Sequence, residues 1–139
     1  MKQTILVTGG TGFIGSHTSV ELIEAGYNVV IADDLGNSKI EVLDGIEKIT
    51  GVRPAFEKID LRDKNATEQL FKKYPDIDGI IHFAASKAVG ESVQKPLLYY
   101  CNNIVSLINL LELMPKYDVK GIIFSSSCTV YGQPKPENL

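Results

Sequence analysis

Short apolar runs alternate with longer segments of helical periodicity along the chain. The apolar runs are rich in β-branched residues, and they cover residues 4–7, 28–32, 54–59, 78–83 and 119–125. The longer segments have the apolar spacing of amphipathic helices, at residues 13–25, 64–74 and 96–114, and a shorter helical stretch ends near residue 49. This pattern is typical of strands joined by helices.

The alternation predicts an α/β fold with a doubly wound parallel sheet. Strands joined through helices run parallel, and nearly continuous apolar strands indicate a sheet covered on both faces. Right-handed crossovers then give five parallel strands in the order 3-2-1-4-5. With 139 residues, the chain has room for one domain, which we assign to residues 1–139. We expect the leucine, methionine and tyrosine side chains of residues 96–114 to lie in its core.

Charge and composition exclude several classes of partner. The net charge of −3 comes from 14 basic and 17 acidic residues spread along the chain, so we expect no nucleic-acid partner. The apolar run at the N-terminus is too short for a signal peptide, and we expect no stretch to span a bilayer. These features predict a cytoplasmic protein without a membrane partner. Cys101 and Cys128 have no metal-ligand spacing, so we expect no metal site.

A glycine-rich turn lies between the first strand and the first helix. Gly9, Gly12 and Gly15 form the pattern Gly-x-x-Gly-x-x-Gly. Glycines in this setting allow a tight turn, the approach of a pyrophosphate to the backbone, and close packing of helix on strand. An ordinary glycine turn is the alternative. The strand before it and the helix after it favour a dinucleotide-binding site.

An acidic residue ends the second strand. Asp33 follows Gly15 by 18 residues (33 − 15), close to the spacing of the acidic residue that binds the adenosine ribose. A carboxylate there repels a 2′-phosphate, which favours NAD over NADP. Two alternatives stay open: Asp33 caps the loop only, or Asp34 beside it shares or takes the role.

Four stretches carry a resemblance to a known family: TGGTGFIGSHT, DDLGNS, HFAASKAVGESVQKPLLYYCNN and FSSSCTVYG. The chain resembles the N-terminal part of the UDP-glucose 4-epimerase family, which belongs to the extended short-chain dehydrogenases/reductases. The resemblance covers nearly the whole chain but less than half the family's length. It implies a sheet that is incomplete relative to the family, and a C-terminal nucleotide-sugar domain that is absent.

The resemblance implies a set of cofactor contacts at the ends of the strands. Phe13 and Ile14 would lie against the phosphates of NAD, and Asn102 would support the cofactor from behind. The adenosine ribose would be surrounded by Asp33, Asp34, Leu35, Gly36, Asn37 and Ser38, and the adenine flanked by Asp60 and Leu61. The pyrophosphate and the nicotinamide ribose would be lined by Phe83, Ala84, Ala85, Ser86 and Lys87. The family often has glycine-leucine where this chain has Ala85 and Ser86.

The family reaction is a transient oxidation at C4 of a UDP-hexose, which interconverts UDP-galactose and UDP-glucose. The resemblance implies that Ser127 hydrogen-bonds the 4-hydroxyl group and helps to pass its proton. A serine that merely caps the loop is the alternative. The base is a tyrosine whose pKa is lowered by a lysine four residues on, along the same helix face.

Tyr131 and Lys135 have this spacing but not this setting. Gly132, Pro134 and Pro136 prevent a regular helix, so the two side chains would not share a face. Tyr131 also matches a tyrosine of the family's serine-rich stretch that is not the base. We therefore expect the base beyond Leu139 and expect the 139-residue chain to bind NAD without catalysing the reaction.

Other predictions concern relatives and partners. A related nucleotide-sugar dehydratase or decarboxylase is the alternative function, although such dehydratases typically carry Asp-Glu where this chain has Cys128-Thr129. The resemblance implies a homodimer for the full-length protein. The last strand, residues 119–125, would form an apolar sheet edge, so we expect the isolated chain to self-associate.

Overall fold

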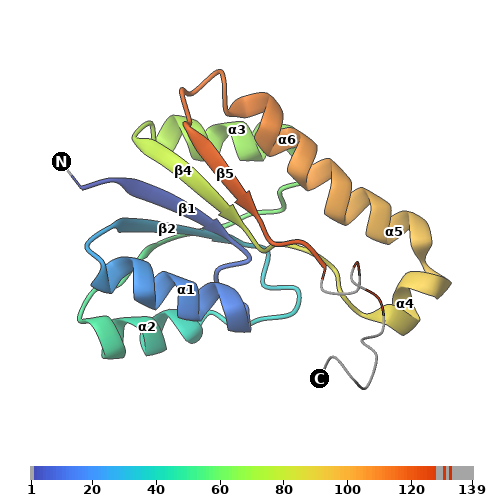
Figure 1. Cartoon of the computed structure of the whole chain (residues 1–139), viewed down its shortest axis with the longest axis horizontal. Coiled ribbons are helices and arrows are strands. Elements are labelled where there is room, and N and C mark those ends of the chain that lie inside the picture. The colour runs from blue at the N-terminus through green and yellow to red at the C-terminus, as the bar shows by residue number, and fades with distance from the viewer. Residues whose placement is uncertain (1, 128–129, 131, 133–139) are drawn as a thin grey trace.

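The computed structural model describes residues 2–127, 130 and 132, and Figure 1 shows the arrangement of their elements. In chain order these are β1 (Thr4–Thr8), α1 (Phe13–Glu24), β2 (Asn28–Asp33), α2 (Val42–Thr50), β3 (Ala55–Lys58), α3 (Lys64–Lys73), β4 (Ile77–His82), α4 (Val89–Gln94), α5 (Pro96–Tyr100), the π-helical turn η1 (Cys101–Val105), α6 (Ser106–Leu113) and β5 (Gly121–Phe124).

The strands form one parallel sheet in the order β3-β2-β1-β4-β5, which confirms the predicted fold and strand order. The chain moves outward from β1 in one direction through β2 and β3, and in the other through β4 and β5. The loops after β1 and β4 therefore diverge at the carboxyl ends of adjacent strands. Such a switch point is where open α/β sheets bind ligands.

Two apolar cores lie on the two faces of the sheet. In β2, Val30 and Ala32 face one core, which includes residues of α3 and α6, while Val29 and Ile31 face the other, which includes residues of α2. Figure 1 shows the same layers, with α1 and α2 on one side of the sheet and α3 and α6 on the other. This strict alternation explains why the strand is apolar along its length.

The helical segment after β4 differs from the prediction in two ways. It contains the π-helical turn η1, which α-helical spacing did not predict. It is also less buried than we expected: Tyr99, Leu110 and Leu113 are buried, but Leu97 is 77% exposed and Tyr100 63% exposed. A helix on the outside of a sheet buries only one stripe, so its remaining apolar side chains face outward.

The expectation that no stretch could span a bilayer is wrong by length and composition. The helical segment Pro96–Tyr117 has 22 residues and is apolar enough to cross a membrane. One face of this segment packs on the sheet through Leu110 and Leu113, as the core helix of a globular domain does.

Candidate functional site

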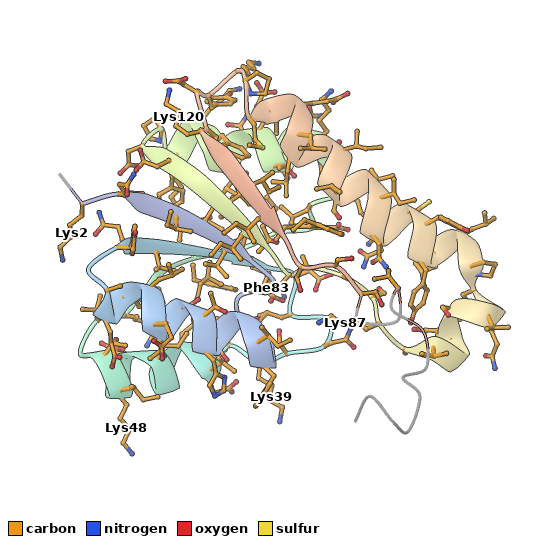
Figure 2. The ribbon with its side chains drawn as sticks, in the orientation of Figure 1. Lys2, Lys39, Lys48, Phe83, Lys87 and Lys120 are labelled. Atoms are coloured by element: carbon orange, nitrogen blue, oxygen red, sulfur yellow. The ribbon has the colours of Figure 1, made fainter. Side chains whose placement is uncertain are left out.

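A cleft of about 510 Å³ opens at the carboxyl ends of the strands. This volume lies within the range of ligand pockets. Among the predicted cofactor residues, all but Leu35 and Gly36 line it. It is also lined by residues that we did not predict: Ala32, Ile59, Arg62, Ala88, Leu98 and Ser106. Figure 2 shows Phe83 at this end of the sheet, with Lys87 on the loop between β4 and α4.

The glycine turn fits closely against the rest of the site. Gly9 has a φ of 67°, and a Cβ atom there would lie 2.8 Å from the Ala84 nitrogen. A Cβ atom on Gly15 would collide with the Gly9 carbonyl oxygen. Gly12 is the N-cap of α1, and no side chain of the described residues caps this helix. The first N–H groups of α1 therefore lie at the cleft without a side-chain acceptor, which suits a phosphate.

The turn needs a fourth glycine that the motif did not predict. A Cβ atom on Gly10 would lie 2.7 Å from Ile31 Cγ2 and 3.0 Å from the Val7 carbonyl oxygen. This requirement comes from packing against β2, so the spacing of the motif could not reveal it. Phe13, by contrast, is 82% exposed and lines the cleft, as expected for a residue that contacts a ligand.

Asp33 both organises its loop and faces the cleft. Its Oδ1 accepts hydrogen bonds from the Leu35 N–H (2.9 Å) and the Ser38 hydroxyl (3.1 Å). Its Oδ2 accepts one from the Thr11 N–H at 3.2 Å. A carboxylate has about four lone-pair sites, so acceptor capacity is left for a ribose hydroxyl. Asp34 is more exposed and accepts the Gly36 N–H at 2.8 Å.

Arg62 is the main charged residue of the cleft that the sequence did not predict. Its Nη2 donates to Asp60 Oδ2 at 2.6 Å, and its Nε donates to both oxygens of the same carboxylate. The Arg62 guanidinium thereby lowers the pKa of Asp60. Arg62 directly follows the predicted adenine contacts Asp60 and Leu61, which is the only signal in the sequence that could have indicated it.

The loop after β4 is held by the helix behind it. Asn102 lies in η1, lines the cleft, and donates from Nδ2 to Ser86 Oγ at 2.7 Å. Ser86 therefore has a polar partner that a leucine at this position would lack. Lys87 is exposed beside it.

Ser127 does not line the cleft. It lies exposed beyond the carboxyl end of β5, where its carbonyl oxygen accepts the Val130 N–H at 3.3 Å. Its catalytic role stays a prediction. Tyr131 and Lys135 lie outside the described residues.

His82 is buried at the end of β4. Its Nδ1 is 2.7 Å from Thr8 Oγ1, and its ring stacks on Phe124 with centroids 5.9 Å apart. Among the described residues, the His82 Nε2 is the buried side-chain nitrogen or oxygen that has no hydrogen-bond partner. Burial lowers the pKa of His82 to about 4, so the ring is neutral at pH 7.

In residues 2–127, 130 and 132, no group of three or more His, Cys, Asp or Glu side chains forms a metal site.

The donor set fits a dinucleotide. The N-terminus of α1 follows a glycine turn and has no side-chain cap, so it offers N–H groups to a pyrophosphate. Asp33 offers a carboxylate to a ribose. The glycines at 9, 10 and 15 let the turn pack closely on the β4 loop, on β2 and on the start of α1.

Comparisons with known proteins agree with this geometry. Residues 5–139 match the model of the NAD dependent epimerase/dehydratase family. The chain is 56% identical over 133 residues to UDP-glucose 4-epimerase uge1 of Schizosaccharomyces pombe, covering 96% of this chain and 37% of that protein. It is 50% identical to the UDP-glucose 4-epimerase of Homo sapiens, covering 97% of this chain and 40% of that protein. The crystal structure of UDP-glucose 4-epimerase from Bifidobacterium longum in complex with NAD+ and UDP superposes with a TM-score of 0.90 at 51% identity, over 96% of this chain and 39% of that one. The chain thus spans about two fifths of the length of these relatives.

Proposed function

Because the chain belongs to the NAD-dependent epimerase/dehydratase family, we propose that its cleft binds NAD+ as the cofactor half of a UDP-glucose 4-epimerase. The observation that carries the proposal is the position of the cleft. It joins the glycine turn, Asp33 and the β4 loop at the switch point of the sheet.

Each part of the cleft has a separate task. The start of α1 binds the pyrophosphate through its N–H groups and its positive dipole end. Asp33 accepts hydrogen bonds from the adenosine ribose, and Asp60 and Leu61 flank the adenine. The loop of Phe83–Lys87 lines the nicotinamide ribose, where the Lys87 ammonium lies on the exposed side of the cleft.

The proposed reaction is the interconversion of UDP-galactose and UDP-glucose. Bound NAD+ supplies a reversible hydride acceptor for C4 of the sugar. Ser127 hydrogen-bonds the 4-hydroxyl group from the end of β5. The chain spans 37% of the length of the relative uge1, and we assign the tyrosine base and the nucleotide-sugar site to the remaining length. We therefore propose that the 139-residue chain alone binds NAD+ and turns over no sugar.

Calorimetric titration of the 139-residue chain with NAD+ tests the binding. We expect heat of binding, a raised Tm, and at least tenfold weaker binding of NADP+, because its 2′-phosphate would approach the carboxylate of Asp33. The absence of both binding heat and thermal stabilisation with NAD+ would overturn the proposal. In a parallel assay, conversion of UDP-galactose by this chain alone would contradict the separation of the base from the cofactor half.

The proposal extends to partners and location. The exposed apolar stripe along α5, η1 and α6, with Leu97, Ile104, Ile108 and Leu111, supports a homodimer of the full-length protein. A UDP-hexose as substrate, the absence of nucleic-acid and membrane partners, and a cytoplasmic location stay predictions from the sequence.

A further inference from the structure

Two asparagines hold the loops of the cleft from behind. Asn103 lies in η1 and Asn109 in α6. Neither is among the described residues that line the cleft, yet each donates to the main chain of a loop that does. An asparagine in an apolar helix needs such partners if its amide is buried.

Asn103 binds both polar groups of one peptide residue. Its Oδ1 accepts the Ser86 N–H at 2.8 Å, and its Nδ2 donates to the Ser86 carbonyl oxygen at 3.0 Å. The carboxamide thus pairs with the backbone as a neighbouring strand would. An aspartate or a leucine of similar size could not make both bonds. The pair fixes Ser86 in the middle of the β4 loop.

The π-helical turn brings this amide to the loop. A π-turn holds more residues than an α-turn, so successive side chains are rotated by a smaller angle. Asn102 and Asn103 therefore both reach Ser86, one at its hydroxyl and one at its main chain. The Ser106 hydroxyl donates to the Asn102 carbonyl oxygen at 2.6 Å, within the same irregular turn. Turns of this kind occur frequently at functional sites.

Asn109 makes the matching contact at the other end of the cleft. It is 5% exposed, and its Nδ2 donates to the carbonyl oxygens of Leu61 (2.8 Å) and Arg62 (3.1 Å). These residues form the loop after β3, where the proposed adenine contact lies. The buried Thr67 hydroxyl donates to the Asp63 carbonyl oxygen at 2.8 Å and lies 3.3 Å from that of Leu61.

We propose that Asn103 and Asn109 are positioning residues, each of which holds a different loop of the cleft. Asn103 places the β4 loop for the pyrophosphate and nicotinamide ribose, and Asn109 places the β3 loop for the adenine. The inference rests on the proposed binding of NAD+, and it predicts that the two residues affect different parts of the cofactor. A purely structural role would instead weaken binding of every part equally.

The test compares Asn103→Ala with Asn109→Ala, with Asn65→Ala, an exposed change on α3, as the control. Calorimetry measures the affinity of each chain for NAD+ and for AMP, which carries only the adenosine half. For Asn103→Ala we expect NAD+ to bind about tenfold more weakly and AMP to bind as in the wild type. For Asn109→Ala we expect both ligands to bind about fivefold more weakly, because both carry the adenosine, and nicotinamide mononucleotide, which lacks it, to bind as in the wild type.

Amide exchange measured by NMR provides a readout that needs no ligand. We expect the Ser86 N–H to exchange at least tenfold faster in Asn103→Ala than in the wild type, and at the wild-type rate in Asn109→Ala. Equal loss of AMP and NAD+ affinity in Asn103→Ala would overturn the division of roles, as would unchanged affinities. If the wild type binds neither ligand, the proposed function fails. The role of Asn103 in holding Ser86 is itself refuted only if the Ser86 N–H exchanges equally fast in Asn103→Ala and in the wild type.

Discussion

The loops after β1 and β2 are held together by main chain, by the Asp33 carboxylate and by the hydroxyl pair of Thr11 and Ser38 at 2.7 Å, whereas the loops after β3 and β4 are held by side-chain amides from a helix. On the first side, the Gly9 N–H donates to the Ala32 carbonyl oxygen at 2.8 Å, and Asp33 accepts the Thr11 N–H. On the second side, Asn103 and Asn109 supply the bonds. The first arrangement also needs positions without a Cβ atom, at Gly9, Gly10 and Gly15, whereas the second depends on two asparagine side chains.

Burial differs between the centre of the sheet and its β5 edge. In β1 and β2 the side chains of Leu6, Val7 and Ile31 are fully buried. In β5, Ile123 is 65% exposed and Phe124 is 52% exposed. The centre of the sheet is therefore intolerant of added volume, while the β5 edge has surface available for a partner. Substitutions that add a side chain should separate the two sides most clearly.

Gly15→Ala should have the largest effect. The new Cβ would collide with the Gly9 carbonyl oxygen and lie 2.8 Å from Gly10 Cα, both of which are main chain. We expect a loss of about 3 kcal/mol of folding free energy, the upper end for overpacking, and loss of NAD+ binding. Urea unfolding and calorimetry measure the two effects.

Gly45→Ala is the matched control for this substitution. Gly45 lies in α2, is exposed, and has nothing within 4 Å of an added Cβ. The same change there should stabilise the chain by about 0.5–1 kcal/mol, because alanine favours a helix interior. Wild-type stability and NAD+ affinity in Gly15→Ala would refute the steric account of the glycine turn.

The two sides also differ in how much the sequence could predict. The glycine turn and Asp33 were predictable because their spacing follows from the geometry of one strand-turn-helix unit. The five strands and their order were predictable because apolar runs and crossover handedness determine them. Asn109 was not predictable, since its partners lie on a loop that only the folded chain brings near. Arg62 was missed although its partner Asp60 is two residues away, because the spacing alone does not show that Arg62 lines the cleft. The π-turn was missed because apolar spacing cannot distinguish it from an α-helix.

His82 should have the second largest effect, through pH. Its pKa is lowered from 6.5 to about 4 by burial, so the unfolded chain binds the proton more readily. The contribution of His82 to the free energy of unfolding is therefore fully present above pH 6.5, and it is lost as the pH falls towards 4. We expect a loss of about 2 kcal/mol between pH 7 and pH 5, a window above the titration of most carboxylates.

Urea unfolding at pH 7, 6 and 5 measures this loss, and His82→Asn is the comparison. Asparagine keeps a polar partner for Thr8 Oγ1 but does not titrate. The variant should be less stable at pH 7 and nearly insensitive to pH between 7 and 5. An equally steep pH dependence in the variant would assign the acid sensitivity to other groups.

The exposed edge of β5 should give the smallest change in folding stability and a change in association. Among the described strands, β5 pairs only with β4, and Ile123 on it is exposed. We expect wild-type chains to associate through this edge, and Ile123→Lys to shift them towards monomer, because lysine disfavours edge pairing. Folding stability should change by no more than about 0.5 kcal/mol.

Ile49→Lys makes the same substitution at an isoleucine of α2 that is 66% exposed, so it should leave association unchanged. Sedimentation over a range of concentrations distinguishes the outcomes. A monomeric wild type at high concentration would show that β5 needs no partner, and the difference between the two sides of the molecule would then lie in their loops alone.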